Sequence, residues 1–299
     1  MFHSETSETP VSAPTLNARI AVGILTRNRA PYLDATLRSL SATDVPVDLS
    51  VTVFDDASDD PDSRRYLTTD DDFLLAAPLR WPSSKVWLDR GLGFLPTLER
   101  VRGVAGRVSV RRSEKPQGVV NASNWATREL FEANPEAPYV FLLQDDLVFA
   151  TDWYQRLAEA CEAELLGDEP SLVSGCCISY IGERRLPRTD RVEFTSAQCM
   201  AIPRAGWEAL PFFREFSAAR QQYDEAVSRA FRERGDGIRL LRPGCVQHIG
   251  FRSQVRPEDG EDVFLSGVGR FCHYSEGPYA WSDEVSDFSS HADLRQVSR

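Results

Sequence analysis

Apolar and polar residues follow one another along this chain in segments whose lengths fit the strands and helices of an α/β protein. The apolar run at residues 139–143 is followed directly by Gln144, Asp145 and Asp146. A continuous run of this length is typical of a strand that is buried on both faces of a mostly parallel sheet. Acids at the carboxyl end of such a strand lie where open α/β sheets bind ligands. Because adjacent like charges repel, the pair predicts a site for a cation or a sugar hydroxyl; the alternative is a solvated loop.

The segments before this run predict a strand–helix–strand unit. Residues 19–26, which are apolar from Ile20 to Leu25, predict the first buried strand, and Leu33, Leu37 and Leu40 share one face of the helix expected next. Residues 51–54 supply the second strand. Such a βαβ unit is expected to be right-handed and to begin a parallel sheet.

The remaining segments continue this alternation and become mixed in the second half. The pattern predicts strands at 108–111, 172–178, 196–202 and 238–241, and helices at 119–134 and 220–234, the latter ended by Gly235. A further helix is expected to be capped by Thr151 and to have Tyr154, Leu157, Cys161 and Leu165 on its packed face. We therefore expect the α/β class, with helices flanking a mostly parallel sheet.

Composition and charge narrow the functional classes. The 299 residues are 42% hydrophobic and 26% charged, and 45 acidic against 34 basic residues give a formal net charge of -11. This balance argues against a general nucleic-acid binder, whose affinity comes largely from neutralising phosphates. No apolar run approaches the ~20 residues of a membrane helix, so no transmembrane segment is expected.

The six cysteines include no Cys-x-x-Cys pair, and several lie in apolar segments. Residues 1–14 lack the apolar core of a signal peptide. Buried, reduced thiols are the better interpretation, and they predict a cytoplasmic protein.

Several common nucleotide-binding motifs are missing. The chain has no Gly-x-x-x-x-Gly-Lys-Ser/Thr sequence, and Gly91-Leu92-Gly93 lacks the third glycine of a dinucleotide fingerprint. Any bound phosphate must therefore be held by a metal ion, by arginine or by scattered backbone groups.

Four stretches, in order from residue 19 to residue 253, resemble glycosyltransferase family 2 enzymes, which have the GT-A fold. Residues 24–40 resemble the Thr-x-Asn-Arg strand end and the Tyr-Leu…Ser-Leu helix, and residues 53–58 resemble the Asp-Asp-x-Ser strand end. Residues 142–149 resemble the Asp-x-Asp metal motif and, together with residues 150–153, the corresponding stretch of N-acetylglucosaminyltransferase I enzymes. Residues 243–250, with Ser253, resemble a late motif of many GT-A enzymes.

This resemblance implies a GT-A fold, with a Rossmann-like, mostly parallel sheet flanked by helices and a mixed acceptor-side half. It implies one domain at 18–255, with a nucleotide-binding half at 18–150 and an acceptor-side half at 151–255. We expect a disordered tail at 1–17 and a lid or tail at 256–299.

The resemblance also implies how the donor is bound. Asp56 resembles the acid that binds the base, and its carboxylate can accept an N–H from uracil or guanine, uracil being favoured. Thr26 and Arg29 are expected beside the nucleotide, and a guanidinium suits phosphate. Asn124 resembles an Asn of the helix before the metal strand, with a supporting or structural role near the donor.

By the same resemblance, Asp146 binds the divalent ion and Asp145 binds the ribose or a metal-bound water. His248 would be the third protein group at this ion, which is Mn²⁺ or Mg²⁺. The alternative for His248 is a hydrogen-bonded core residue. Gln144 departs from the family pattern, because some relatives have a third acid there.

The resemblance places a general base on a helix start between the metal motif and the last strand. Asp224 fits this position best and Glu225 is second; the alternative is a solvated helix face. The arginines between 184 and 191 could hold an anionic acceptor, although a solvated loop is the simpler interpretation.

The sequence thus predicts a metal-dependent, inverting glycosyltransferase with a UDP-sugar donor and an unknown acceptor. Two alternatives remain: a sugar-1-phosphate nucleotidyltransferase, and a GT-A-like domain that binds a glycan or a partner without turnover. The nucleotidyltransferases have a Gly-rich turn and a basic residue after the first strand, which Gly23–Thr26 does not supply.

Overall fold

The computed structural model describes ten ranges of the chain. They are residues 20–41, 43–46, 49–66, 107–167, 170–175, 191–192, 197–214, 223–235, 237–241 and 244–248. The expected N-terminal tail, the arginines at 184, 185 and 188, and the expected C-terminal lid or tail lie outside these ranges.

Strands and helices alternate through the first half, as the apolar pattern predicts. The elements are β1 (Ala21–Thr26), α1 (Ala30–Ser41), β2 (Ser50–Asp55), α2 (Pro61–Tyr66), β3 (Arg107–Arg112), α5 (Val119–Ala133), β4 (Tyr139–Gln144) and β5 (Leu147–Phe149). The first five residues of β4 are buried, which is why its sequence is one continuous apolar run.

The second half contains shorter strands and three further α-helices in the described ranges. The elements are α6 (Trp153–Leu165), β6 (Leu172–Ser174), β7 (Arg191–Val192), β8 (Cys199–Pro203), α7 (Arg204–Ala209), the 3-10 helix η2 (Pro211–Phe213), α8 (Tyr223–Arg234), β9 (Ile238–Leu240) and β10 (Val246–His248). Helix α8 ends at the expected Gly235, whose φ of 89° is a conformation that glycine adopts without steric cost.

Eight of the described strands form one sheet in the order β3-β2-β1-β4-β8-β6-β9-β7. Strands β3, β2, β1 and β4 are parallel to one another, and β8 is antiparallel to both β4 and β6. The predicted α/β class, with a parallel first half and a mixed second half, is confirmed.

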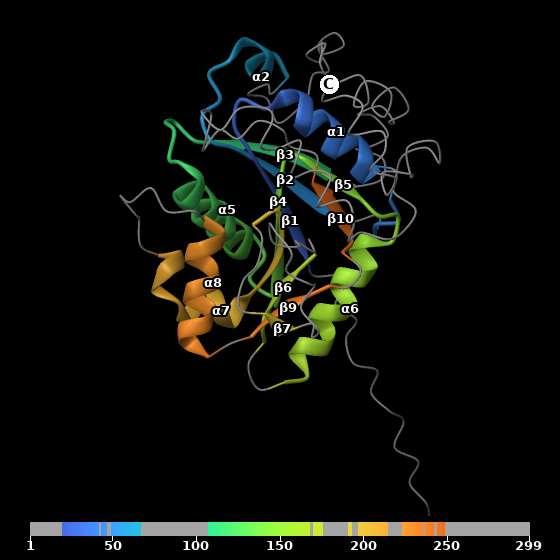
Figure 1. Cartoon of the computed structure of the whole chain (residues 1–299). Helices are drawn as coiled ribbons and strands as arrows, with labels where there is room; N and C mark the ends of the chain where they lie inside the picture. Colours follow the sequence, from blue (N-terminus) through green and yellow to red (C-terminus); the bar gives the residue numbers. More distant parts are fainter. Residues whose placement is uncertain are drawn as a thin grey trace, which may run out of the picture.

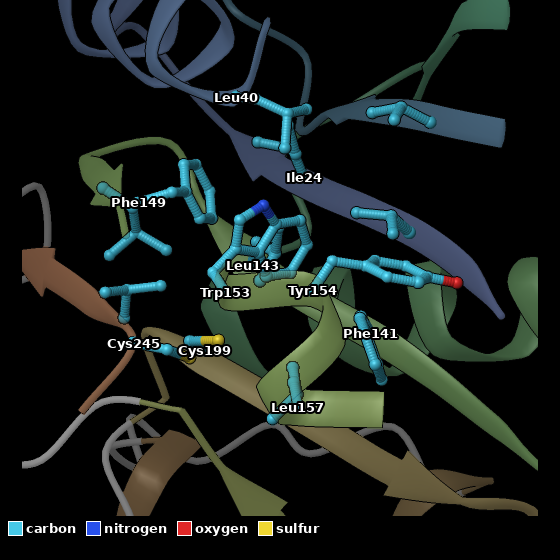
Figure 2. Packing of buried hydrophobic residues seen from close by; sticks show 14 of the residues in the cluster. Ile24, Leu40, Phe141, Leu143, Phe149, Trp153, Tyr154, Leu157, Cys199 and Cys245 are labelled. Atoms are coloured by element: carbon cyan, nitrogen blue, oxygen red, sulfur yellow. The ribbon is translucent and has the colours of Figure 1, made fainter. Parts of the chain in front are cut away.

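Helices cover both faces of the sheet, and each face has its own core (Figure 1). Helices α1 and α6 pack on one face, where Figure 2 shows Trp153 and Tyr154 of α6 lying against Phe141 and Leu143 of β4. Helices α5 and α8 with η2 pack on the other face, through residues such as Leu130. Strand β10 pairs with β5 as a separate two-stranded ribbon on the α1 and α6 side.

Two details of helix α6 differ from the sequence prediction. It begins at Trp153 with Asp152 as the N-cap residue, one position later than Thr151 predicts. Leu165, predicted on the packed face, is 37% exposed because it lies in the last turn of the helix. In the described ranges, no helix combines the length and the apolar character needed to cross a bilayer.

Candidate functional site

The carboxyl ends of β1 and β4 bring Thr26 and Asp145 together. These strands are parallel neighbours with Leu25 opposite Gln144, so the next residue of each strand meets its counterpart at the sheet edge. The Thr26 hydroxyl donates a hydrogen bond of 2.6 Å to Oδ2 of Asp145, and both side chains are buried. Two residues that are 119 positions apart thus form one site, at the edge where the sequence predicts it.

Arg29 joins this site from the loop between β1 and α1. Its guanidinium lies 3.2 Å from Oδ1 of Asp145 and donates a hydrogen bond of 2.5 Å to Oδ2 of Asp146. The side chains of the two acids are only 3% and 2% exposed. The site therefore holds two buried carboxylates with one cation between them.

Burial and charge act in opposite directions on these groups. Burial raises the pKa of Asp145 to about 6, with Arg29 lowering this pKa and Asp146 raising it further. Burial alone would lower the pKa of Arg29, but the two carboxylates outweigh it and hold that pKa above its usual value. Arg29 is thus the permanent positive charge of the site.

Helix α1 fixes the main chain around the carboxylate pair. The Thr36 hydroxyl lies 2.7 Å from the carbonyl oxygen of Asp145 and accepts a hydrogen bond of 2.9 Å from the Leu147 N–H. The Ser39 hydroxyl accepts a hydrogen bond of 3.0 Å from the Phe149 N–H. This role was not predicted. Its signal in the sequence is that Thr36 and Ser39, three positions apart, interrupt the apolar face of the helix.

The end of β2 carries two acids with different surroundings. Oδ1 of Asp55 accepts hydrogen bonds from the N–H and the hydroxyl of Ser58, and Arg112 Nε lies 3.5 Å from Oδ2. Burial raises the pKa of Asp55, while these hydrogen bonds and Arg112 lower it. Asp55 therefore holds the turn after β2 in place.

Asp56 points to the start of α5. Its carboxylate accepts hydrogen bonds of 2.7 Å from the Gln117 N–H and 3.0 Å from the Gly118 N–H, and Gly118 is the N-cap residue of α5. A carboxylate at a helix N-terminus is stabilised by the unpaired N–H groups there. Oδ1 of Asp56 also accepts a weaker hydrogen bond of 3.3 Å from the Ser113 hydroxyl. A carboxylate has about four lone-pair sites, so this preorganised group has capacity for one further N–H.

Asn28 links the loop after β1 with the turn after β2. It has a φ of 53°, and its side-chain oxygen accepts hydrogen bonds of 2.8 Å from the Asp59 N–H and 3.1 Å from the Asp60 N–H. Its own N–H donates to the Ser58 hydroxyl over 2.8 Å. Asn tolerates this left-handed conformation better than most residues. Asn28 thereby fixes the loop from which the neighbouring Arg29 reaches the two acids.

Asn124 lies on the face of α5 that meets η2. Its Nδ2 donates a hydrogen bond of 2.7 Å to the carbonyl oxygen of Phe212, and the residue is 6% exposed. This contact is a structural one between α5 and η2, and a role of Asn124 toward the donor stays a prediction.

Asp224 and Glu225 lie in the first turn of α8. The Glu225 N–H donates a hydrogen bond of 2.9 Å to Oδ1 of Asp224. The side chain of Asp224 is half-buried, whereas that of Glu225 is exposed. Tyr223, directly before them, is buried, and its ring lies 5.8 Å from that of Phe212. The helix start is therefore fixed against η2, and the choice of base between the two acids stays a prediction.

Strand β10 brings His248 to the carboxylate pair along the backbone. In the antiparallel pair with β5, His248 lies opposite Leu147, the residue that directly follows Asp146. The side chain of His248 lies outside what the structure describes. The register nevertheless places this residue one position from Asp146, although 102 residues separate them in the sequence.

The donor set of this edge suits a hard divalent cation. Among the described residues, no group of three or more His, Cys, Asp or Glu side chains could hold a metal ion. The pair Asp145 and Asp146 supplies carboxylate oxygens, which Mn²⁺ and Mg²⁺ prefer, and it already holds a positive group, the guanidinium of Arg29. The two carboxylates therefore fit such an ion, and a role of His248 at it stays a prediction.

Comparison with known proteins finds no matching family model and no matching curated protein. Among solved structures, the mannosyltransferase PcManGT from Pyrobaculum calidifontis, in complex with GDP-Man and Mn²⁺, is 18% identical over 87% of this chain and 66% of its own, with a TM-score of 0.47. S. aureus TarS 1-349 in complex with UDP-GlcNAc is 13% identical over 87% of this chain and 68% of its own, with a TM-score of 0.49. A longer S. aureus TarS is 14% identical over 94% of this chain and 42% of its own, with a TM-score of 0.46. The chain thus spans about two thirds of the first two and less than half of the third.

Proposed function

We propose that this protein is a metal-dependent, inverting glycosyltransferase that moves a sugar from a nucleoside-diphosphate donor, a UDP-sugar in the favoured case, to an acceptor hydroxyl. The observation that carries the proposal is the buried pair Asp145 and Asp146 at the carboxyl end of β4. This pair lies beside Thr26, which belongs to the first of the motifs that resemble family 2 glycosyltransferases. The local similarity to N-acetylglucosaminyltransferase I enzymes does not define the sugar, and the acceptor is not identified.

Each predicted residue has a role in this reaction. Asp146 and His248 would hold Mn²⁺ or Mg²⁺, which when bound neutralises charge on the departing diphosphate, and Asp145 would bind the ribose or a water on the ion. Asp56, held by the N–H groups of Gln117 and Gly118, accepts the ring N–H of the base.

Deprotonation of the acceptor hydroxyl falls to the first turn of α8. Asp224 accepts this proton, with Glu225 as the alternative base. Both acids lie in the first turn of α8, which the contact of Tyr223 with Phe212 fixes against η2.

Substitution of Asp146 tests the proposal directly. We expect Asp146→Ala to abolish Mn²⁺-dependent donor hydrolysis or sugar transfer, measured as UDP release over a panel of nucleotide sugars, because the ion loses its principal ligand. Glu132→Ala, which removes an exposed acid of α5, is the control and should keep full turnover. Undiminished turnover in Asp146→Ala would contradict the proposed metal-dependent reaction.

The alternatives have distinct outcomes in the same assays. Formation of a nucleotide sugar from a nucleoside triphosphate and a sugar 1-phosphate would indicate a nucleotidyltransferase. Titration calorimetry that detects no Mn²⁺-dependent binding of UDP or GDP would favour a non-catalytic binding domain.

A further inference from the structure

Arg29 supplies the positive charge that stabilises the Asp145–Asp146 pair in the absence of any ligand. Its guanidinium contacts both carboxylates, at 3.2 Å and 2.5 Å, and its side chain is 14% exposed against 3% and 2% for the acids. Two adjacent carboxylates removed from water are strongly destabilising unless a cation accompanies them. Arg29 therefore occupies the electrostatic position that a divalent ion would take.

The backbone of Arg29 is fixed, whereas its guanidinium keeps spare donors. The carbonyl oxygen of Arg29 accepts hydrogen bonds from the Tyr32 and Leu33 N–H groups in the first turn of α1. The guanidinium carbon lies 4.5 Å from the centroid of the Tyr32 ring, and Nε finds no acceptor within the described ranges. A guanidinium has five N–H donors, so this side chain can turn toward another anion without moving its backbone.

One guanidinium only partly balances the two acids. A divalent ion matches their charge, yet it cannot share the same oxygens with Arg29, because two cations at this distance repel one another. A diphosphate offers Arg29 a new anionic partner close to the position that it leaves, and Arg pairs with phosphate through two parallel hydrogen bonds.

We propose that Arg29 is an internal competitor of the divalent ion, which it keeps weakly bound until a nucleoside diphosphate draws the guanidinium away. This inference rests on the proposed function, and it adds that the ion and the nucleotide bind cooperatively through Arg29. The coupling is reciprocal: each ligand raises the affinity for the other by the same factor.

Calorimetric titration of Mn²⁺ into the full-length chain, without nucleotide, tests this inference. We expect Arg29→Met to bind Mn²⁺ roughly tenfold more tightly than the wild type, because the competing cation is gone. The same substitution should lower the melting temperature in chelator, and Mn²⁺ should restore it. It should also weaken the binding of UDP to the Mn²⁺-loaded protein. Gain of metal affinity with loss of UDP affinity is not expected of a merely structural residue, whose substitution would weaken both.

Arg27→Met is the matched control, because Arg27 lies 4.0 Å from Asp56 and its side chain is 37% exposed. It should bind Mn²⁺ as the wild type does. Arg29→Lys retains the charge and should therefore keep the wild-type Mn²⁺ affinity. Unchanged or weaker Mn²⁺ binding by Arg29→Met overturns the inference while leaving the proposed function intact. Failure of the wild type to bind Mn²⁺ even with UDP or GDP overturns both.

Discussion

Gly175 lies at a point where three segments of the chain meet without a side chain between them. Its N–H donates to the carbonyl oxygen of Cys199 over 2.9 Å, and its own carbonyl oxygen accepts from the Cys245 N–H over 2.8 Å. A Cβ atom on Gly175 would come within 2.6 Å of Cys199 Sγ and 2.8 Å of Cys245 Sγ. Both thiols are fully buried, so little room exists for either sulfur to retreat.

We expect Gly175→Ala to lower the free energy of unfolding by roughly 1–3 kcal/mol, because the added methyl group overpacks a closed interior. Urea denaturation measures this change. Gly167→Ala is the control, since a Cβ there would have Glu164 O at 3.5 Å, an ordinary contact. The double substitution Gly175→Ala/Cys199→Ala should recover part of the loss, because the methyl group then fills the space of the sulfur. Equal stability of the two glycine variants would contradict this packing.

The sequence predicted that the cysteines are buried and reduced, but it did not predict that Cys199 and Cys245 lie side by side at Gly175. Cys161, Cys199 and Cys245 are buried and form no disulfide bond within the described ranges, as their apolar surroundings predicted. The proximity of Cys199 and Cys245 around Gly175 depends on which strands become neighbours, and no local pattern contains that information. The positions of acids at strand ends were predicted in the same way: Asp56 and Asp145 lie where β2 and β4 end, as expected, whereas the pairing of Arg29 with Asp145 and Asp146 was not predicted.

At the scale of elements, β5 shows how a helix can complete the edge of a strand. One edge of β5 pairs with β10, and on the other edge the Leu147 and Phe149 N–H groups donate to the hydroxyls of Thr36 and Ser39 in α1. These hydroxyls replace the carbonyl groups of a neighbouring strand. Because β5 directly follows Asp146, the same contacts position the candidate metal site.

Thr36→Val should lower the free energy of unfolding by about 1–3 kcal/mol. Valine has the shape of threonine but no hydroxyl, so the buried Leu147 N–H loses its acceptor. Thermal or urea denaturation gives this value. Thr36→Ser keeps the hydroxyl and should remain close to the wild type apart from one lost methyl group. If Thr36→Val and Thr36→Ser are equally stable, the hydroxyl does not hold the edge of β5.

Elements with a strong internal pattern were predicted well, and those without one were not. The apolar runs of β1, β2 and β4 and the amphipathic α5 appear where the sequence predicted them. The short elements α7, η2 and β7 carry too few residues for a periodic pattern, and tertiary contacts define them. Arg204 at the start of α7 illustrates this. Its guanidinium donates to the carbonyl oxygens of Ala137 and Asn134, at 2.9 Å and 2.7 Å, beyond the end of α5.

At the scale of the whole molecule, one sheet separates two cores and carries the candidate site at its carboxyl-terminal edge, where the parallel strands end. The acids of β2 and β4 reach that edge because both strands run parallel to β1. The periodicity of the sequence was sufficient to predict this half. It could not predict that β8 would enter antiparallel between β4 and β6, because strand order depends on long-range packing.

The central position of β1 and β4 predicts the order in which the sheet opens. Each of these strands has a neighbour along both edges, and helices bury both faces; Val22, Ile24, Val140 and Phe141 are all fully buried. Strand β3 lies at the end of the described sheet, and Arg111 on it is exposed.

Amide hydrogen exchange should therefore be slowest in β1 and β4, with exchange free energies equal to that of global unfolding, and faster in β3. Mass spectrometry of peptic fragments under native conditions resolves these strands. Because the candidate site lies where the two slowest strands end, its carboxylates should stay in place while the outer strands fluctuate. Exchange as fast in β4 as in β3 would show instead that the sheet is not organised around its centre.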